Sequence, residues 1–253
     1  MKAYIINLKS AVDRKKQMEI YFQDLTIQPI FIDAVSKYDL TVDDERFSKY
    51  LYKLKHGKMV NLAELGCYLS HLKAMKAFLE TEDTHAIILE DDAKLDSKFE
   101  GVIEKALKYS HMYDLLRLSG NHEPVSFKIR ELDSSFSLVC NINNQLGSTG
   151  YLMNRHAAKQ MLKNLLPMSL PYDHAFDREW CLNVKTLFMK PNLVTVNHFG
   201  APELSQITDI DVNLKLTRIK RITVLFFKLY NELIKLFFRL TQILKYKLFY
   251  YKS

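Results

Sequence analysis

Three consecutive carboxylates near the middle of the chain are the residues most able to do chemistry. Glu90, Asp91 and Asp92 directly follow Ala86–Leu89, an apolar run that predicts a strand buried on both faces. Three adjacent negative charges at such a strand end are costly unless a positive group neutralises them. Carboxylate oxygens suit Mg²⁺ or Mn²⁺, which usually share their coordination with substrate phosphates. The residues alone leave two interpretations open: a site for a metal and a diphosphate, or a solvated acidic turn.

The position of these acids on the strand predicts which side of the sheet each side chain faces. Side chains alternate along a strand, so Glu90 and Asp92 are expected on one side and Asp91 on the other. Open α/β folds bind ligands at the carboxyl edge of the sheet. A metal could then lie between the strand end and a diphosphate.

The segments before this strand predict an α/β fold. Ala3–Leu8 and Pro29–Asp33 are expected to be strands, and a helical pattern lies between them. A strand, helix and strand at this spacing form a βαβ unit, which predicts a parallel pair. Asn7 and Leu8 would then lie at the carboxyl end of the first strand, and Asp33 at the end of the second.

A second group of polar residues lies on a predicted helix. Lys37–Lys58 reads as a long loop or small helical insertion that could act as a lid. The helix that follows begins at Asn61, and Glu64 three residues later suggests a capping box. Ser70 and His71 lie inside this helix. From spacing alone, His71 is best interpreted as a packed or solvated histidine.

Polar motifs also occur in the second half of the chain. Gly147–Tyr151 is a glycine-bounded turn that runs into a strand, and Tyr172–Cys181 is expected to be a helix. Asp173 would lie in its first turn, where free N–H groups and the helix dipole favour a carboxylate. That is already a sufficient structural reason for an aspartate there. His198 lies just beyond the last predicted strand.

Length and cysteine content limit the class of protein. The chain has 253 residues, 48% of them hydrophobic, which is enough for one sizeable domain with or without an appendage. Cys67, Cys140 and Cys181 show no metal-binding spacing and predict reduced thiols in a cytosolic protein. The N-terminal sequence does not have the pattern of a signal peptide.

The positive charge of the chain is concentrated at its end. The net charge is +7, but the segment 215–253 holds ten lysines and arginines against one acid, Glu232. This segment therefore carries +9 and the first 214 residues carry −2. The net positive charge of the chain comes from the tail, so it does not support nucleic-acid binding by the domain.

The tail has an amphipathic helical pattern. A narrow polar stripe contains Arg221, Lys228, Glu232, Lys235, Arg239 and Gln242. The wide opposite arc is rich in Phe and Leu, and the basic residues interrupt any run long enough to span a bilayer. Such a helix suits the surface of an anionic membrane. The alternatives are a helix docked on the domain and a helix paired with another chain.

Taken together, these motifs resemble one family. In chain order they are Tyr4–Leu8, Asp13–Arg14, Glu64–His71, Ile88–Asp92, Gly147–Leu152, Pro171–His174 and Ser205–Ile207. In this set and order the chain resembles glycosyltransferase family 25, the group that contains bacterial lipooligosaccharide galactosyltransferases. The resemblance covers roughly residues 1–208, and the tail lies outside it.

The resemblance implies an architecture and a reaction. Residues 1–208 would form a GT-A-type domain that binds a nucleotide sugar on a mainly parallel sheet, followed by a helical tail, 209–253. The reaction would be inverting transfer of a hexose, with UDP-galactose or UDP-glucose as donor and Mn²⁺ or Mg²⁺ as aid. Glu90 and Asp92 are expected to hold the metal, completed by His198, although the triplet leaves open which carboxylate pair binds.

The resemblance also implies roles for other residues. The acceptor hydroxyl needs a base, for which Asp173 is the first candidate and Asp177 the second. By analogy with inverting glycosidases, the base would lie about 6 to 9 Å from the metal-binding pair. The residues expected to contact the nucleotide sugar are Asn7, Leu8, Arg14, Asp33, Ser70, His71, Glu90, Asp91, Thr149, Gly150 and Tyr151.

Three hypotheses follow for the whole chain. The leading one is a cytoplasmic enzyme on the inner face of a bacterial inner membrane, which extends a lipid-linked oligosaccharide and contacts anionic lipid through residues 215–253. The second is a metal-dependent phosphate-ester hydrolase, although no nucleophile or P-loop is recognisable. The third is a non-catalytic adaptor at the membrane surface.

Overall fold

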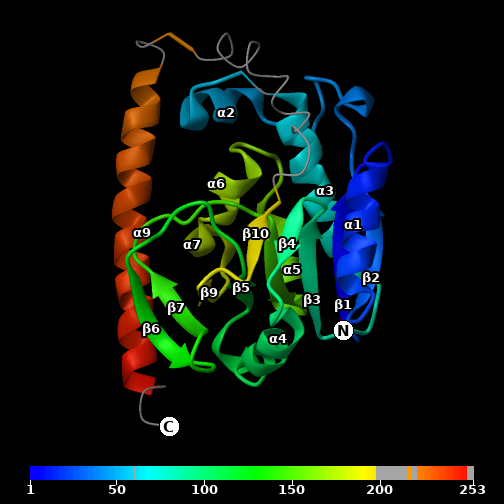
Figure 1. Ribbon diagram of the computed structural model, residues 1–253. Helices are drawn as coiled ribbons and strands as arrows, with labels where there is room; N and C mark the ends of the chain where they lie inside the picture. The colour runs from blue at the N-terminus through cyan, green and yellow to red at the C-terminus, as the bar shows by residue number, and fades with distance from the viewer. Residues whose placement is uncertain (60, 198–215, 218–220, 250–253) are drawn as a thin grey trace.

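The computed structural model describes residues 1–59, 61–197, 216–217 and 221–249, which form an α/β fold around one mixed sheet (Figure 1). In spatial order its strands are β2 (Gln28–Asp33), β1 (Lys2–Asn7), β3 (His85–Glu90), β8 (Gly150–Asn154), β5 (Leu115–Arg117), β9 (Thr186–Lys190), β7 (Ser137–Asn141) and β6 (Ser126–Glu131). A separate antiparallel ribbon pairs β4 (Ala93–Leu95) with β10 (Val194–Val196).

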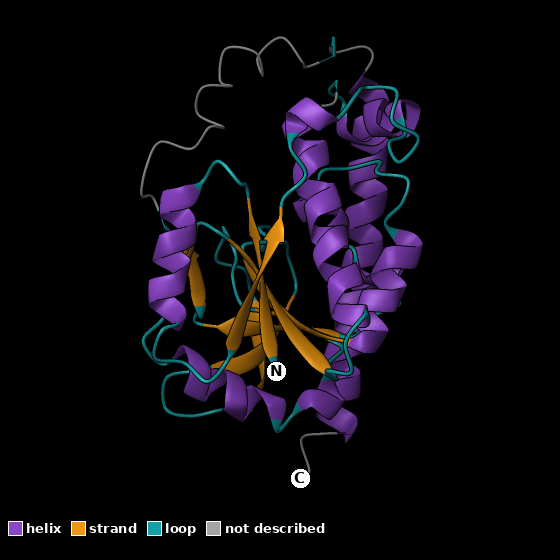
Figure 2. Cartoon of the chain, turned by 90° about the vertical axis from the view of Figure 1, so that its right-hand side faces the viewer, coloured by secondary structure: helices purple, strands orange, loops and turns teal. Residues whose placement is uncertain are grey.

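Helices cover both faces of this sheet (Figure 2). They are α1 (Val12–Phe22), α2 (Lys49–His56), α3 (Leu62–Leu79), α4 (Phe99–Leu107), α5 (Arg155–Asn164), α6 (Tyr172–Phe176), α7 (Glu179–Leu182) and α9 (Ile222–Phe249), with 3₁₀ turns at Lys37–Asp39 and Ser110–Met112. One hydrophobic core packs α3, α5 and α6 on the sheet, and the other packs α1 and α4 on its opposite face.

The expectation of a mainly parallel sheet was wrong, because the sheet is mixed. β1 pairs in parallel with β2 and β3, and β5 with β9, whereas the other four neighbouring pairs are antiparallel. The parallel β1–β2 pair of the predicted βαβ unit is confirmed. Two of the antiparallel pairs involve β8, which lies between β3 and β5 and runs opposite to both.

The expected helix over 172–181 is also divided. The chain forms α6 and then α7, and the two are separated by Asp177 and Arg178. The break lies where the carboxylate of Asp177 is held inside the domain by two arginines. This tertiary pairing is stronger than the local helical pattern, which carries no information about partners distant in sequence.

The register of the parallel strands gathers polar residues at one edge. Ala86–Leu89 is fully buried, as a strand covered on both faces should be. In the pairing of β1 with its neighbours, Ile6 lies opposite Glu90 and Asn7 lies opposite Asp33. The carboxyl ends of β1, β2 and β3 therefore meet at the same edge.

Helix α3 is tied closely to the segment that follows β2. Its N-cap is Asn61, whose side chain accepts a hydrogen bond from the Ala63 N–H at 2.9 Å. Inside the helix, the Ser70 hydroxyl donates to the Gly66 carbonyl at 2.7 Å and accepts from the Val35 N–H at 2.8 Å. A Cβ atom on Gly66 would lie only 2.6 Å from the Val35 carbonyl oxygen. Only a glycine allows this approach.

Gly66→Ala is therefore expected to destabilise the fold by about 1–3 kcal/mol, because the methyl group would press on backbone rather than on a flexible side chain. Gly101→Ala is the matched control, since a Cβ atom on that α4 residue would meet no atom within 4 Å. It should stabilise the protein by up to about 1 kcal/mol through helix propensity. Urea unfolding of both variants measures the contrast, and equal effects would contradict the packing argument.

The C-terminal helix α9 runs along the β6–β7 side of the sheet (Figure 1). Its domain-facing side combines polar and apolar residues: Lys235 and Arg239 are only 2% and 1% exposed, and Ile243 and Tyr246 join a hydrophobic core. Phe226 and Phe237 on the apolar arc are 70% and 73% exposed. No described helix is both long and apolar enough to span a bilayer. The proposed boundary between residues 208 and 209 lies outside the described residues.

Candidate active site

The acidic edge begins with Asp91, which already has two partners. The Asn7 amide donates to its carboxylate at 2.7 Å, and an Arg14 guanidinium nitrogen lies 3.0 Å from it. The Leu8 backbone also bonds to Asp91. Burial raises the pKa of Asp91, and these partners only partly oppose the rise. Asp91 therefore fixes the ends of β1 and β3 to the start of α1.

Glu90 contacts a different set of residues, in keeping with the alternation of side chains along a strand. The Ser148 hydroxyl donates to its Oε1 at 2.7 Å, and His71 Nε2 lies 3.4 Å from the same oxygen. The Glu90 backbone N–H donates to the Thr149 carbonyl at 2.9 Å. Burial alone would raise the pKa of Glu90, but the His71 and Ser148 contacts outweigh it and lower the pKa. Glu90 is held in its charged form.

Asp92 is the least satisfied member of the cluster. Burial, followed by the charges of Glu90 and Asp91, raises its pKa to about 7. Its buried Oδ1 has no hydrogen-bond partner among the described residues. A buried carboxylate oxygen without a donor is costly unless something positive binds it. Asp92 and Glu90 thus offer hard oxygen ligands that fit Mn²⁺ or Mg²⁺.

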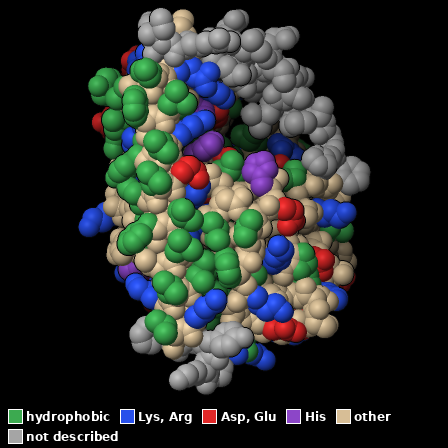
Figure 3. All heavy atoms as spheres, turned by 90° about the vertical axis from the view of Figure 1, so that its left-hand side faces the viewer, with side chains coloured by type: hydrophobic (Ala, Val, Ile, Leu, Met, Phe, Trp, Pro, Cys, Tyr) green, Lys and Arg blue, Asp and Glu red, His purple; other side chains and the backbone are tan. Residues whose placement is uncertain are grey.

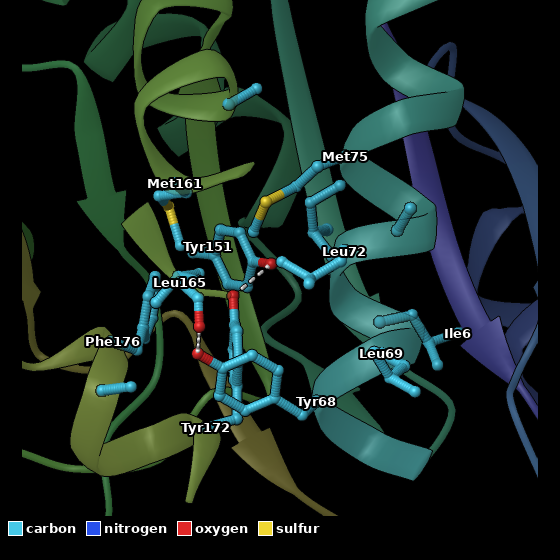
Figure 4. Close-up of a cluster of buried hydrophobic side chains, with 14 of the residues drawn as sticks. Ile6, Tyr68, Leu69, Leu72, Met75, Tyr151, Met161, Leu165, Tyr172 and Phe176 are labelled. Carbon is cyan, nitrogen blue, oxygen red and sulfur yellow. Dashed lines mark hydrogen bonds between the residues drawn. The ribbon is translucent and has the colours of Figure 1, made fainter. Parts of the chain in front are cut away.

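A stack of buried rings lies beside Glu90, and two of its members, Tyr151 and Tyr172, are shown in Figure 4. His71 Nδ1 lies 3.1 Å from the Tyr151 hydroxyl, which bonds to the Tyr172 hydroxyl at 3.0 Å. The His71 and Tyr172 rings are parallel, with centroids 3.9 Å apart. His71 and Tyr151 are fully buried, so in this structure they position Glu90 and do not line an open surface.

Asp173 is electrostatically linked to the acidic edge through Cys67. Burial raises the pKa of the Cys67 thiol, and the charges of Glu90, Asp173 and Asp92 raise it further. The first turn of α6 and the end of β3 therefore act on the same thiol of α3. Asp173 Oδ1 accepts a hydrogen bond from the His174 N–H at 2.8 Å. This places the first candidate base in the same electrostatic environment as the acidic cluster.

Cys67 also shows what sequence reasoning missed. One ligand atom each of Cys67, His71 and Glu90 lies within 4.8 Å of the others, a grouping that could hold a metal ion. Cys67 and His71 are one helical turn apart, and Glu90 comes from another element, so the spacing along the chain gives no signal. The raised pKa of Cys67 opposes thiolate ligation. The carboxylates of Glu90 and Asp92 are the better ligands.

Asp177, the second candidate base, is in a different environment. It is buried, and its Oδ1 lies 3.1 Å from Arg117 and 3.3 Å from Arg239. Arg117 also donates to the Gly147 carbonyl. The sequence signal for Arg117 is a single charged residue within the apolar run Leu115–Leu118. Asp177 holds elements together and does not face an open surface.

The other predicted donor-site residues are dispersed. Asp33 lies at the carboxyl end of β2 and pairs with Lys9 at 3.4 Å on the surface. Ser70 connects α3 to the segment after β2, and the Gly150 N–H donates to the Ser119 hydroxyl at 2.9 Å. His198 lies outside the described residues.

Comparison with known proteins gives the context for this site. Residues 1–176 match the sequence model of glycosyltransferase family 25, described as an LPS biosynthesis protein. Procollagen galactosyltransferase 1-A of Xenopus laevis is 26% identical over 67% of this chain and 29% of its own length. Lipooligosaccharide biosynthesis protein lic2B of Haemophilus influenzae is 24% identical over 69% of this chain and 67% of its own.

A putative glycosyltransferase of Acanthamoeba polyphaga mimivirus is 30% identical over 54% of this chain and 44% of its own length. The chain spans only about a third of the length of the first curated relatives it matches. The family match nevertheless covers more than half of the chain and includes the acidic edge, the ring stack and Asp173. The chain therefore belongs to glycosyltransferase family 25.

Proposed function

We propose that this enzyme transfers a hexose from a UDP-sugar to a lipid-linked oligosaccharide, with inversion, on a GT-A-type domain. Galactose is the favoured sugar and glucose the next, a choice supported by the procollagen galactosyltransferase relative. The lipooligosaccharide biosynthesis relative supports the acceptor class. The observation that carries the proposal is the unpartnered buried oxygen of Asp92 beside Glu90, at the edge where the strands end.

Asp92 and Glu90 would hold a divalent cation, Mn²⁺ or Mg²⁺. The fit rests on their hard oxygen atoms and on the lack of a donor for Asp92 Oδ1 among the described residues. When bound, such a cation neutralises the charge that develops on the departing diphosphate. Asp91 is already occupied by Asn7 and Arg14, so it is not one of the proposed ligands.

Arg14 would bind the donor diphosphate. Its guanidinium holds Asp91, yet 35% of its side chain stays exposed at the same edge. Arginine binds phosphate oxygens in a bidentate geometry that lysine cannot reproduce. A diphosphate would therefore lie between the Arg14 side chain and the Asp92–Glu90 pair.

Asp173 would accept the proton of the acceptor hydroxyl as the new glycosidic bond forms. Its charge acts on Cys67 together with Glu90 and Asp92, which supports a location near the donor. Inversion needs a carboxylate on the acceptor side of the sugar ring. The buried ion pairs of Asp177 make it unsuitable as that base.

We expect Asp173→Asn to reduce transfer by about 10²–10⁴-fold, because the general base is lost while donor binding is kept. Asp177→Asn should instead lower the melting temperature, since buried Arg117 loses its counter-ion and Arg239 keeps only Glu179. Measuring the transfer rate, UDP-sugar affinity and melting temperature of both variants separates the two roles. Full transfer activity in Asp173→Asn would rule this residue out as the base.

The donor can be tested without knowing the acceptor. Incubation with UDP-galactose or UDP-glucose and Mn²⁺ should release UDP slowly, because water replaces the acceptor. Addition of a lipid-linked oligosaccharide should accelerate the release. If no UDP-sugar yields UDP and calorimetry detects no UDP binding, the donor assignment is wrong. The family assignment favours this activity over the hydrolase and adaptor hypotheses.

A further inference from the structure

Helix α9 presents an unusual surface, because its hydrophobic side faces away from the domain. Eleven large hydrophobic side chains between Ile222 and Leu248 are exposed, including Leu233 at 60% and Phe237 at 73%. Figure 3 shows hydrophobic side chains, in green, gathered along this side of the molecule. We name this surface the outward face of α9. Contiguous apolar surfaces of this kind mark interaction sites in soluble proteins.

The opposite side of the helix is fixed to the domain by polar contacts. Arg239 bonds to Glu179 at 2.6 Å and to the Asn143 carbonyl at 2.7 Å, and Lys235 bonds to Asn144. Arg178 donates to Asn231 at 2.8 Å. Because these groups are paired inside the protein, α9 cannot turn its outward face inward without breaking them. The outward face is therefore a fixed feature of the fold.

We propose that the outward face of α9 docks in the plane of an anionic lipid membrane. The helix has 28 residues, which corresponds to about 42 Å of length. A straight apolar strip of this length matches a flat bilayer interface, in which its Phe and Leu side chains can insert. The contact is parallel to the membrane, in agreement with the absence of a spanning helix among the described residues.

The charges of α9 favour lipid over a second copy of the chain. Its only acid in the described range is Glu232, and that carboxylate pairs with Lys235. The exposed lysines Lys245 and Lys247 thus lack a carboxylate on the same helix. A symmetric dimer would bring the same lysines of both copies into one interface. Anionic headgroups would neutralise them instead.

A groove beside α9 strengthens the choice of an anionic surface. It has a volume of about 770 Å³, and its walls include Trp180, Phe238 and Tyr246. Lys185 and Lys245 lie at the same groove, with one acid, Asp114, whose carboxylate already accepts bonds from the Lys185 N–H and the Asn154 amide. Aromatic rings with lysines suit the boundary between acyl chains and phosphates. The groove is thus positioned to receive headgroups at the side of the inserted helix.

The test uses the full chain and vesicles of phosphatidylcholine with or without phosphatidylglycerol. The wild type should co-sediment with the anionic vesicles. Leu233→Ser combined with Phe237→Ser should weaken this binding by about tenfold or more, because two apolar side chains lose their burial in lipid. Ile20→Ser combined with Tyr38→Ser is the matched control, since these exposed side chains lie on other elements. It should bind like the wild type.

Two further measurements complete the test. Lys245→Gln and Lys247→Gln should each reduce the preference for anionic vesicles by about fivefold. Trp180 is the single tryptophan, and its ring lies 6.4 Å from that of Phe238. Its emission should be unchanged in every variant without vesicles, which shows that α9 stays docked.

Two outcomes would overturn the proposal. One is the absence of co-sedimentation with either vesicle type. The other is a dimer in analytical ultracentrifugation that the Leu233/Phe237 variant dissociates, because a second copy would then cover the outward face. UDP release in the absence of vesicles should be the same for this variant and the wild type. The proposal can therefore fail without affecting the proposed activity.

Discussion

Asp92→Asn is expected to make the protein more stable while it removes most of the transfer activity. The substitution keeps the shape of the side chain but removes a carboxylate whose pKa burial and two neighbouring acids raise to about 7. The free energy of unfolding should rise by about 2 kcal/mol at neutral pH, since solvent screens part of the repulsion. Transfer should fall about 10²–10³-fold, because the diphosphate loses its electrostatic support.

The gain in the free energy of unfolding depends on pH, because the pKa of Asp92 is higher in the folded protein than in the unfolded chain. The folded protein binds the Asp92 proton more tightly than the unfolded chain, so wild-type stability falls as pH rises from about 4 to about 7. Below this window both forms carry the proton, and the variant should show no advantage. Above it the advantage should be complete. Urea unfolding at several pH values measures the difference.

Two comparisons make this prediction specific to the acidic edge. Asp24→Asn removes an exposed aspartate after α1 and should change neither stability nor transfer. Mn²⁺ should raise the melting temperature of the wild type more than that of Asp92→Asn, because the proposed site loses a ligand. If Asp92→Asn transferred sugar at the wild-type rate, the role given to Asp92 would be wrong.

Arg239→Met should cost about 3–5 kcal/mol, because it leaves the buried Glu179 carboxylate without its cation and Asp177 with Arg117 alone. Arg239 bonds to both oxygens of Glu179 and lies 3.3 Å from Asp177. Methionine preserves much of the length and apolar character of the side chain. The loss would therefore report the missing charge rather than missing volume. Urea unfolding at neutral pH gives the free energy directly.

Lys228→Met on the same helix is the control, because this lysine is exposed and should tolerate the change within about 0.5 kcal/mol. Adding Glu179→Gln to Arg239→Met should restore part of the stability, since one buried charge is removed with its partner. A loss of less than about 1 kcal/mol in Arg239→Met would show that α9 is an independent appendage. Removal of α9 would then be harmless to the domain.

Local patterns in the sequence predicted the elements that form the acidic edge. The apolar run Ala86–Leu89, the parallel pair β1–β2 and the cap at Asn61 depend on neighbouring residues and short crossovers. Such features follow from side-chain periodicity and capping chemistry. These local patterns accordingly predict that Asn7 and Glu90 lie at one edge of the sheet.

Features that depend on long-range pairing could not be predicted in this way. The direction of β8 depends on the route of the chain between β7 and Gly150, which no local pattern encodes. The helical wheel separated the polar stripe of α9 from its apolar arc correctly. It did not show that the polar stripe faces the domain, because that choice depends on Asp177 and Glu179, about sixty positions earlier.

Ordered synthesis from the ribosome gives the position of β8 a further consequence. β3 and β5 cannot become neighbours of β8 until the chain has grown past Asn154, although both are made earlier. Glu90 is likewise made 58 residues before Ser148, whose hydroxyl donates to its carboxylate. Glu179 is made 60 residues before Arg239, the arginine that bonds to its carboxylate. The nascent protein thus completes its acidic edge and the ion pairs of α9 only after segments far along the chain have been made.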